Sequence, residues 1–119
     1  MIIEDDDPVR RILARIIKLV HAEATTAEHG MAGLKALEQN AFDLVITDLK
    51  MPGVNGLDVV QWIRKHRSPL PVIVISGFAT NEDSDKIAAL GARLLRKPFT
   101  PDGVHDAMRL ALRAHSVPK

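Results

Sequence analysis

The sequence of 119 residues lacks cysteine, which excludes disulfide scaffolds, thiolate metal sites and cysteine nucleophiles. Aromatic residues are few, and Trp62 and the three phenylalanines are too scattered to form a stacking platform for nucleic acid. The 16 lysines and arginines stand against 15 aspartates and glutamates, so a net charge of +1 gives no reason to expect a nucleic-acid or membrane partner. The sequence also has no P-loop, no dinucleotide fingerprint and no G-x-S-x-G motif.

Long apolar runs are missing as well. No stretch approaches the roughly 18 residues of a membrane span, and Met1 to Ile3 is followed at once by acids, unlike a signal peptide. The composition, 46% hydrophobic and 26% charged, is that of a soluble globular protein, and the length is that of one domain. We therefore expect a single cytoplasmic domain over residues 1–119. Because the first strand begins abruptly, we also expect a few residues before Met1 in the natural chain.

Short β-branched segments alternate with longer segments of helical period. The pattern predicts strands at 1–3, 23–28, 44–47 and 72–75, and a fifth short strand that begins at 94–95 and ends near Lys97. It predicts helices at 8–20, 31–39, 56–66, 81–90 and 101–114. Parallel strands need crossover connections, so five strand–helix pairs favour an α/β fold: a doubly wound, five-stranded parallel sheet with helices on both faces.

The expected helices differ in how firmly apolar residues would anchor them. The first has six apolar residues on one face, with Asp7 as its N-cap and Pro8 in its first helical position. The fourth has only Ile87 and Leu90 before Gly91 ends it, so it is the helix best able to move. The other residues expected to point inward are Val9, Ile12, Leu13, Ile16, Ile17 and Val20 in the first helix, Leu34 and Leu37 in the second, Leu57, Val60 and Ile63 in the third, and Val104, Met108 and Ala111 in the fifth.

Ligands of a doubly wound sheet bind beyond the carboxyl ends of its strands, and here those ends carry polar side chains. Glu4, Asp5 and Asp48 follow the first and third strands and are expected to converge. Packed carboxylates repel each other unless a cation neutralises them, and a small set of oxygen ligands suits Mg²⁺. Taken alone, residues 4–7 also fit a solvated acidic turn at a helix start, and Asp48 also fits a turn cap.

Further side chains at this edge suit phosphoryl chemistry. Beside a metal, the Asp48 carboxylate can attack a phosphorus centre and form an acyl phosphate. Ser76, after the fourth strand, offers a hydroxyl donor beside Gly77, and Lys97, after the fifth, offers a compact positive charge for a phosphoryl oxygen. Each of these residues alone also fits an ordinary turn, so the inference depends on their combination.

These motifs each follow their own strand in a fixed order: the acids, then Asp48-Leu49-Lys50-Met51-Pro52-Gly53, then Ser76-Gly77, then Lys97-Pro98-Phe99. Over nearly its whole length, the chain thereby resembles the receiver domain of two-component response regulators, the CheY-like family. The resemblance implies a flavodoxin-like sheet with strand order 2-1-3-4-5. It also implies that the domain is no conventional enzyme, but catalyses the phosphorylation and dephosphorylation of its own aspartate.

The resemblance assigns roles to single residues. Asp48 would be the phosphoacceptor, which takes a phosphoryl group from a phosphohistidine on a sensor histidine kinase or a histidine phosphotransfer protein. Ser76 would be the switch hydroxyl, Lys97 would pair with the phosphoryl group, and the Lys97–Pro98 peptide would be cis. Asp5 would be the more direct metal ligand of the acidic pair. The implied Mg²⁺ ligands are Glu4, Asp5, Asp48 and the backbone carbonyl of Lys50.

Phosphorylation replaces a carboxylate with a more anionic group, and this change is expected to alter the fold locally. We expect the switch to run through the helix at 81–90, the strand at 94–95 and the helix at 101–114, and to control an output. The partner at that surface would be an output domain or a second copy of the chain. Leu110 and Leu112, which lie off the inward face of the last helix, would serve such a contact.

The chain departs from the family pattern at a few positions. Leu94 stands three residues before the family's lysine, where an aromatic residue is common, so rotation of an aromatic ring cannot report activation here. Asn55 stands where many members have Asp before Gly56, which we interpret as a neutral exchange in a turn. Phe78 follows the switch serine by two residues, and we expect it to slow hydrolysis of the acyl phosphate.

Two other functions stay open at this point. A Mg²⁺-dependent phosphohydrolase of the haloacid-dehalogenase-like type would use Asp48 as its nucleophile, but it needs an aspartate two residues later, where this chain has Lys50. A pseudo-receiver would switch without phosphate, but it would usually lack one of the motif residues, all of which are present here. Turnover of phosphate esters would favour the first, and a lack of Asp48 phosphorylation under donor excess would favour the second.

Overall fold

The computed structural model describes residues 1–116, in which five strands alternate with five helices. The strands are β1 (Ile2–Ile3), β2 (Thr26–Ala27), β3 (Val45–Asp48), β4 (Val72–Ser76) and β5 (Arg93–Arg96). The helices are α1 (Asp7–Lys18), α2 (Gly30–Gln39), α3 (Gly56–His66), α4 (Asn81–Ala89) and α5 (Pro101–Ser116). The alternation is the one that the sequence predicts. None of the helices in the described part of the chain combines the length and the apolar character that crossing a membrane requires.

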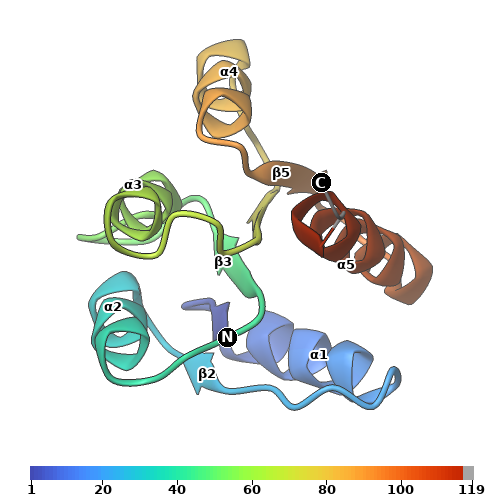
Figure 1. The fold of residues 1–119 in the computed structure, drawn as a ribbon. Helices are drawn as coiled ribbons and strands as arrows, with labels where there is room; N and C mark the ends of the chain where they lie inside the picture. The colour runs from blue at the N-terminus through green and yellow to red at the C-terminus, as the bar shows by residue number, and fades with distance from the viewer. Residues whose placement is uncertain (117–119) are drawn as a thin grey trace.

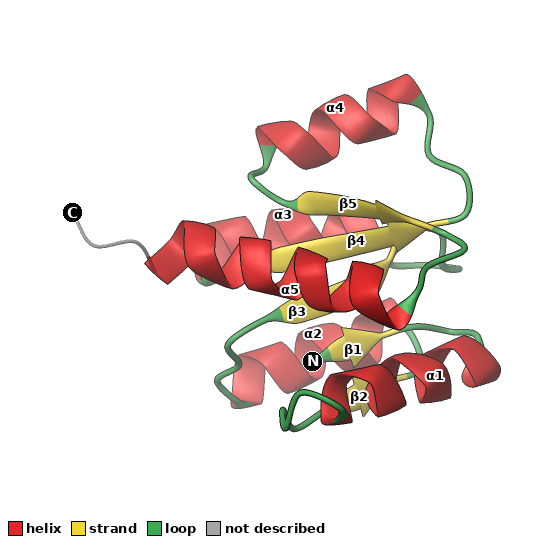
Figure 2. Cartoon of the chain, turned by 90° about the vertical axis from the view of Figure 1, so that its right-hand side faces the viewer, coloured by secondary structure: helices red, strands yellow, loops and turns green. Residues whose placement is uncertain are grey.

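The strands form one parallel sheet in the order β2-β1-β3-β4-β5. Helices α1 and α5 cover one face, while α2, α3 and α4 lie on the other (Figure 1). The strands all point the same way, so the loops after their carboxyl ends meet at one edge of the sheet (Figure 2). The doubly wound α/β fold and its strand order are therefore confirmed.

An apolar cluster on each face holds the sheet between its helices. Every residue of β3 and β4 is buried, because helices cover both faces of these central strands. On one side the buried helix residues are Leu13, Ile16, Ile17, Val104, Ala107, Met108 and Ala111. On the other side they include Leu37, Val59, Val60, Ile63 and Ile87. Burial on both faces explains why continuous apolar runs, and not alternating ones, mark these two strands in the sequence.

Helix α1 differs from the prediction at both ends. Its N-cap is Asp6 and not Asp7, since the Asp6 carboxylate accepts a backbone N–H of the first turn and Asp7 is already helical. The helix ends at Lys18, so Val20 lies beyond it and is 45% exposed. Ile12 is 49% exposed, because it lies at the margin of the narrow stripe with which α1 contacts the sheet. The inward face of α1 is thus narrower than predicted.

The strand at the edge of the sheet is shorter than the predicted 23–28. Only Thr26 and Ala27 pair with β1, because β1 itself offers only Ile2 and Ile3 as partners. Strand β5, in contrast, begins at Arg93, one residue before the expected start at Leu94, because it follows β4 over four paired positions. In both cases the neighbouring strand sets the length.

Helix α3 begins at Gly56, as predicted, and Asn55 caps it. The Asn55 side chain accepts the N–H of Asp58, and the Asp58 carboxylate accepts the N–H of Asn55. Asn and Asp are about equally good N-caps, which agrees with a neutral exchange at this position. Within the helix, Val59 is fully buried although it was not among the expected inward residues, while Leu57 is only partly buried.

Helix α4 is thinly anchored, as its sequence predicts. Ile87 is the one buried side chain among its nine residues. A reciprocal cap of Thr80 and Asp83 starts the helix, and Gly91 follows its end with a φ of +71°, in the left-handed region that favours glycine. Local capping therefore holds α4 together more than packing does.

Candidate functional site

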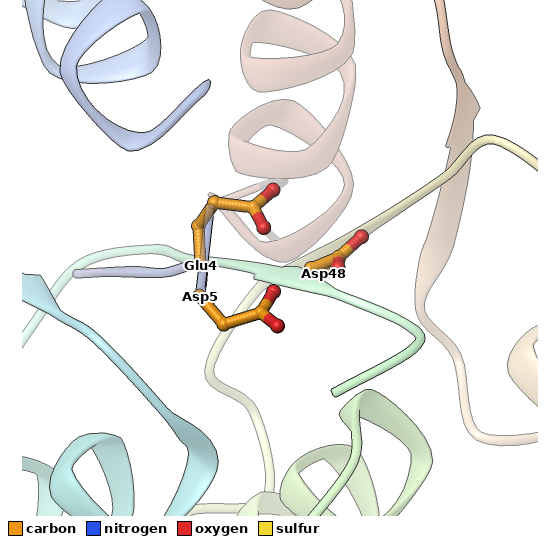
Figure 3. Close-up of side chains that lie close together, drawn as sticks. All are labelled: Glu4, Asp5 and Asp48. Atoms are coloured by element: carbon orange, nitrogen blue, oxygen red, sulfur yellow. The ribbon is translucent and has the colours of Figure 1, made fainter. Parts of the chain in front are cut away.

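The ends of β1 and β3 bring three carboxylates together. Glu4 and Asp5 follow β1, and Asp48 is the last residue of β3. The two strands are neighbours, with Ile3 paired to Thr47, so their next residues lie side by side. Figure 3 shows the three acidic side chains gathered at this edge. One oxygen from each carboxylate lies within 4.8 Å of the others, which confirms the convergence expected from the sequence.

The three acids differ in their exposure to water. Glu4 is 1% exposed and Asp48 7%, whereas Asp5 is exposed. The backbone N–H of Asp6 donates to Glu4 Oε2 at 3.2 Å, which fixes one side of the Glu4 carboxylate. The cluster thus has a buried, hydrogen-bonded side and an open side at Asp5.

Arg10, which the sequence interpretation did not single out, holds the turn between β1 and α1. Its Nη1 donates to the carbonyl oxygen of Glu4 at 2.8 Å, and its Nη2 pairs with the carboxylate of Asp7. The spacing of Asp7 and Arg10, three residues apart at the start of a helix, was the available signal for this pair. The contact fixes the backbone from which Glu4 extends.

Lys97 supplies the positive charge nearest to the acids. Its Nζ lies 3.3 Å from Glu4 Oε1 and 3.3 Å from Asp48 Oδ1. The Lys97 N–H donates to the Ser76 carbonyl oxygen at 2.8 Å, which continues the pairing of β5 with β4 by one residue. The Lys97–Pro98 peptide is cis, as the family resemblance implies. The fifth strand thereby delivers an ammonium group between two buried carboxylates.

Burial and mutual repulsion disfavour the charged forms of the buried acids. The pKa of Glu4 rises to about 7, first because burial penalises its charge and second because Asp48 lies beside it. Burial also raises the pKa of Asp48, although the Lys97 ammonium opposes this shift. Burial alone would lower the pKa of Lys97, but the charges of Asp48 and Glu4 outweigh it and raise that pKa. One ammonium group therefore does not fully neutralise the cluster.

The donor set fits a hard divalent cation. Carboxylate oxygens are preferred ligands of Mg²⁺, and a cation here would oppose both the burial and the repulsion that raise the pKa values of the buried acids. Within the described residues, Glu4, Asp5 and Asp48 form the single group of three or more acidic, histidine or cysteine ligands close enough together to hold a metal ion. This edge of the sheet could thus bind a metal.

Ser76 and Lys50 flank the acidic cluster. Ser76 ends β4 and is buried, and its Oγ accepts the N–H of Phe78 at 3.1 Å while its hydroxyl keeps a proton to donate. Phe78 itself is 74% exposed, in the loop that leads to α4. The Lys50 side chain contacts α4, with Nζ 3.7 Å from Asp83 Oδ2. Its backbone carbonyl as a metal ligand stays a prediction.

The start of α3 packs closely against the backbone of Asp48. The N–H of Gly56 donates to the Leu49 carbonyl oxygen at 2.9 Å. A Cβ at Gly56 would lie 2.4 Å from the Asp48 carbonyl oxygen and 2.8 Å from the Leu49 Cα, so only glycine permits this approach. The glycine therefore helps to set the position of the Asp48 backbone.

Comparison with known proteins agrees with this geometry. The model of the response regulator receiver domain family matches residues 1–109. The KDP operon transcriptional regulatory protein KdpE of Escherichia coli (strain K12) is 37% identical over 119 residues, which cover 98% of this chain and 52% of KdpE. The sensor histidine kinase RcsC of Salmonella typhi is 32% identical over 121 residues, which cover 100% of this chain and 13% of RcsC. The chain thus spans about half the length of KdpE and a smaller share of RcsC.

Among solved structures, a response regulator receiver domain protein from Clostridium thermocellum is similar, with a TM-score of 0.89 and 28% identity over 95% of this chain and 92% of that chain. A likeness of this extent agrees with the doubly wound fold seen here. The family match extends over most of the chain and includes every strand and the acidic edge. The chain belongs to the response regulator receiver domain family, and is a CheY-like receiver domain of two-component signalling.

Proposed function

We propose that this receiver domain, taken as residues 1–119, accepts a phosphoryl group on Asp48 from a phosphohistidine of a sensor histidine kinase or a histidine phosphotransfer protein. The observation that carries the proposal is the place of Lys97 Nζ, 3.3 Å from both Asp48 Oδ1 and Glu4 Oε1 at an edge with three carboxylates. Phosphoryl transfer depends mostly on positioning and on neutralising charge. A strand end that fixes a carboxylate beside an ammonium group supports both.

In the proposed step, a carboxylate oxygen of Asp48 attacks the phosphorus atom. A P–O bond to Asp48 forms as the P–N bond to the phosphohistidine breaks, and the electron pair of that bond stays on the imidazole nitrogen. Lys97, already within 3.3 Å of Asp48, pairs with an oxygen of the incoming phosphoryl group. The domain thus catalyses its own modification and later its own dephosphorylation, without acting as a conventional enzyme on a free substrate.

Glu4, Asp5, Asp48 and the backbone carbonyl of Lys50 would hold Mg²⁺, which when bound supplies positive charge to the phosphoryl oxygens. Glu4 already receives the Asp6 N–H at 3.2 Å and the Lys97 ammonium at 3.3 Å. Asp5 is exposed at the open side of the cluster, which supports Asp5 as the more direct ligand.

Ser76 would donate its hydroxyl proton to the phosphoryl group and move toward it. Because Ser76 Oγ accepts the N–H of Phe78 in the unmodified domain, this movement would pull on the loop that precedes α4. We expect the change to spread through α4, β5 and α5 to an output domain or a second copy of the chain, with exposed Leu110 and Leu112 as apolar contacts. The proposal places this switch in the cytoplasm, with no direct contact to nucleic acid.

The test is the intact mass of the protein after incubation with a small-molecule phosphodonor and Mg²⁺, beside Asp48→Asn. A single phosphoryl adduct that is lost in the variant and without Mg²⁺ is the expected result. A folded protein that gains no adduct under donor excess would overturn the proposal and favour a pseudo-receiver. Release of many phosphate molecules from phosphate esters would instead favour the phosphohydrolase.

A further inference from the structure

The side chain of Lys50 links the loop after Asp48 to the first turn of α4. Its Nζ lies 3.7 Å from Asp83 Oδ2. The same Asp83 oxygen accepts the backbone N–H of Thr80 at 3.1 Å, while Thr80 Oγ1 accepts the Asp83 N–H at 3.0 Å. One carboxylate oxygen therefore both closes the N-terminal cap of α4 and attracts the Lys50 ammonium group.

The opposite end of α4 is held by a guanidinium group from α3. Arg64 Nε donates to the Leu90 carbonyl oxygen at 2.5 Å, and Nη2 donates to that of Gly91 at 3.3 Å. A helix end leaves such carbonyls without intrahelical partners. Nη1 of the same arginine donates to the carbonyl oxygens of Ser68 and Leu70, both at 2.7 Å. Two hydrogen bonds thus reach this end of α4, and two more hold the same guanidinium group to the segment that enters β4.

The two ends of α4 are therefore held unequally. The Arg64 end receives two directed hydrogen bonds, from a guanidinium group that two further bonds hold in place. The contact of Lys50 with Asp83 is one ion pair whose lysine side chain is 65% exposed. Exposed ion pairs contribute little stability and are easily exchanged for another partner. Only Ile87 of α4 is buried between these ends, so packing opposes little movement. The weakly held end is the one that contacts the loop after the predicted phosphoacceptor, through Lys50.

We infer that Lys50 is a releasable tether, which holds the first turn of α4 to the loop after Asp48 and leaves Asp83 when Asp48 is phosphorylated. The second half of this inference rests on the proposed function. A phosphoryl group carries about two negative charges at neutral pH and adds oxygen acceptors, so it competes with Asp83 for the ammonium group. Lys50 follows Asp48 by two residues, so their Cα atoms lie at most about 7 Å apart, within reach of the flexible lysine stem. Helix α4 then moves about its Arg64 end.

Amide hydrogen exchange, read by mass spectrometry, tests the tether. Lys50→Met keeps the apolar stem without the charge, and Asp83→Asn keeps an acceptor for the Thr80 N–H. Without phosphodonor, each should speed exchange in the first turn of α4 by about two- to fivefold, the range that one exposed ion pair supports. The double variant should add nothing further, because both single changes break the same contact. Lys50→Arg, which keeps the positive charge, should exchange as slowly as the native protein.

Lys86→Met is the matched control, since Lys86 Nζ forms an ion pair within α4, 3.3 Å from Glu82 Oε1, and does not involve the loop after Asp48. With acetyl phosphate and Mg²⁺, the first turn of the native protein and of the control should exchange faster than before. The first turn of Lys50→Met should show no added change. Intact mass on the same samples gives the phosphoryl occupancy of Asp48.

The outcomes separate the two parts of the inference, which are the Lys50 tether in the unmodified protein and its release when Asp48 is phosphorylated. Slow exchange in donor-free Lys50→Met would refute the tether, whatever phosphorylation does. A native protein that gains the phosphoryl group without faster exchange at the first turn, or a Lys50→Met variant that responds as fully as the control, would refute release. If no phosphoryl group is gained at all, the proposed function fails, and the donor-free comparison still decides the tether.

Discussion

Replacing Gly56 with alanine tests how the start of α3 positions Asp48. The new Cβ would lie 2.4 Å from the Asp48 carbonyl oxygen and 2.8 Å from the Leu49 Cα, where ordinary contacts are 3.4–4 Å. Both neighbours are backbone atoms, which cannot rotate away as the end of a side chain can. Either the start of α3 or the end of β3 must therefore move by about 1 Å.

The expected loss is about 2 kcal/mol in the free energy of unfolding. Overpacking costs about 1–3 kcal/mol, and a clash with backbone belongs in the upper part of that range. Inside a helix, alanine is more favourable than glycine by up to about 1 kcal/mol of helix propensity. This advantage is smaller at position 56, the first residue of α3, so it offsets little of the cost of the clash. The φ angle of Gly56 lies outside the left-handed region, so the penalty comes from the contact and not from backbone strain.

Two other glycines serve as controls. Gly53 has a φ of +73° with open space around a Cβ, so Gly53→Ala should cost only the backbone strain of about 1 kcal/mol. At Gly77 a Cβ would come no closer than 3.8 Å to the Lys97 side chain, so Gly77→Ala should be nearly neutral. Urea unfolding followed by the fluorescence of Trp62, the single tryptophan, measures all three variants. If Gly56→Ala loses less stability than Gly53→Ala, the close approach to the Asp48 backbone does not matter and the reasoning is wrong.

Three further predictions concern the site and helix α4. In EDTA at pH 8, Asp48→Asn should raise the free energy of unfolding by about 1 kcal/mol. The pKa of Glu4 rises from 4.5 to about 7, a shift that costs at most about 3 kcal/mol of stability. Burial is the first cause of this shift and the charge of Asp48 the second, so the variant removes only part of the cost. A raised pKa costs stability as the pH rises from 4.5 through 7, so the gain should disappear at pH 5, where Glu4 is protonated in the folded protein; urea titrations with an equal gain at both pH values would contradict this. Arg64→Lys should lower the free energy of unfolding by about 2 kcal/mol more than Arg109→Lys does. An ammonium group cannot replace the four directed hydrogen bonds of Arg64, whereas Arg109 forms an exposed ion pair with Asp106. Similar melting curves for the two variants would show that the Arg64 contacts contribute little. Phe78→Asn should lose its phosphoryl group faster than the native domain, because the exposed ring follows the switch serine and limits the access of water; equal lifetimes by intact mass would count against this role.

The segments that could be predicted from sequence are those with one dominant local signal. The apolar run of β4 and the Asn55-Gly56 start of α3 marked both elements to within one residue. The N-cap of α1 was wrong because Asp6 and Asp7 are equally good caps by residue type. The choice depends on a contact across the turn, since Asp7 pairs with Arg10 and leaves the cap to Asp6.

The candidate site divides in the same way. The residues that follow each strand were identified from sequence, because parallel strands bring their carboxyl ends to one edge whatever the details of packing. Their roles in phosphoryl transfer stay predictions, and the experiments above address them. The Lys50 contact with Asp83 and the Arg64 hydrogen bonds to the carbonyl oxygens of Leu90 and Gly91 were not predicted, because the partners lie far apart in the sequence and no local spacing marks them.

The sequence by itself determined the order of strands and helices and the identity of the side chains at each strand end, since both depend on residues adjacent in the chain. Only the tertiary structure decided that Lys97 lies between Glu4 and Asp48, although Lys97 and Glu4 are 93 positions apart. It also decided that the Lys50 ammonium group pairs with Asp83. The pKa of Glu4 depends in the same way on burial and on neighbours from other strands. Distances between side chains and the burial of each group depend on how the whole chain packs, so no local pattern in the sequence can predict them.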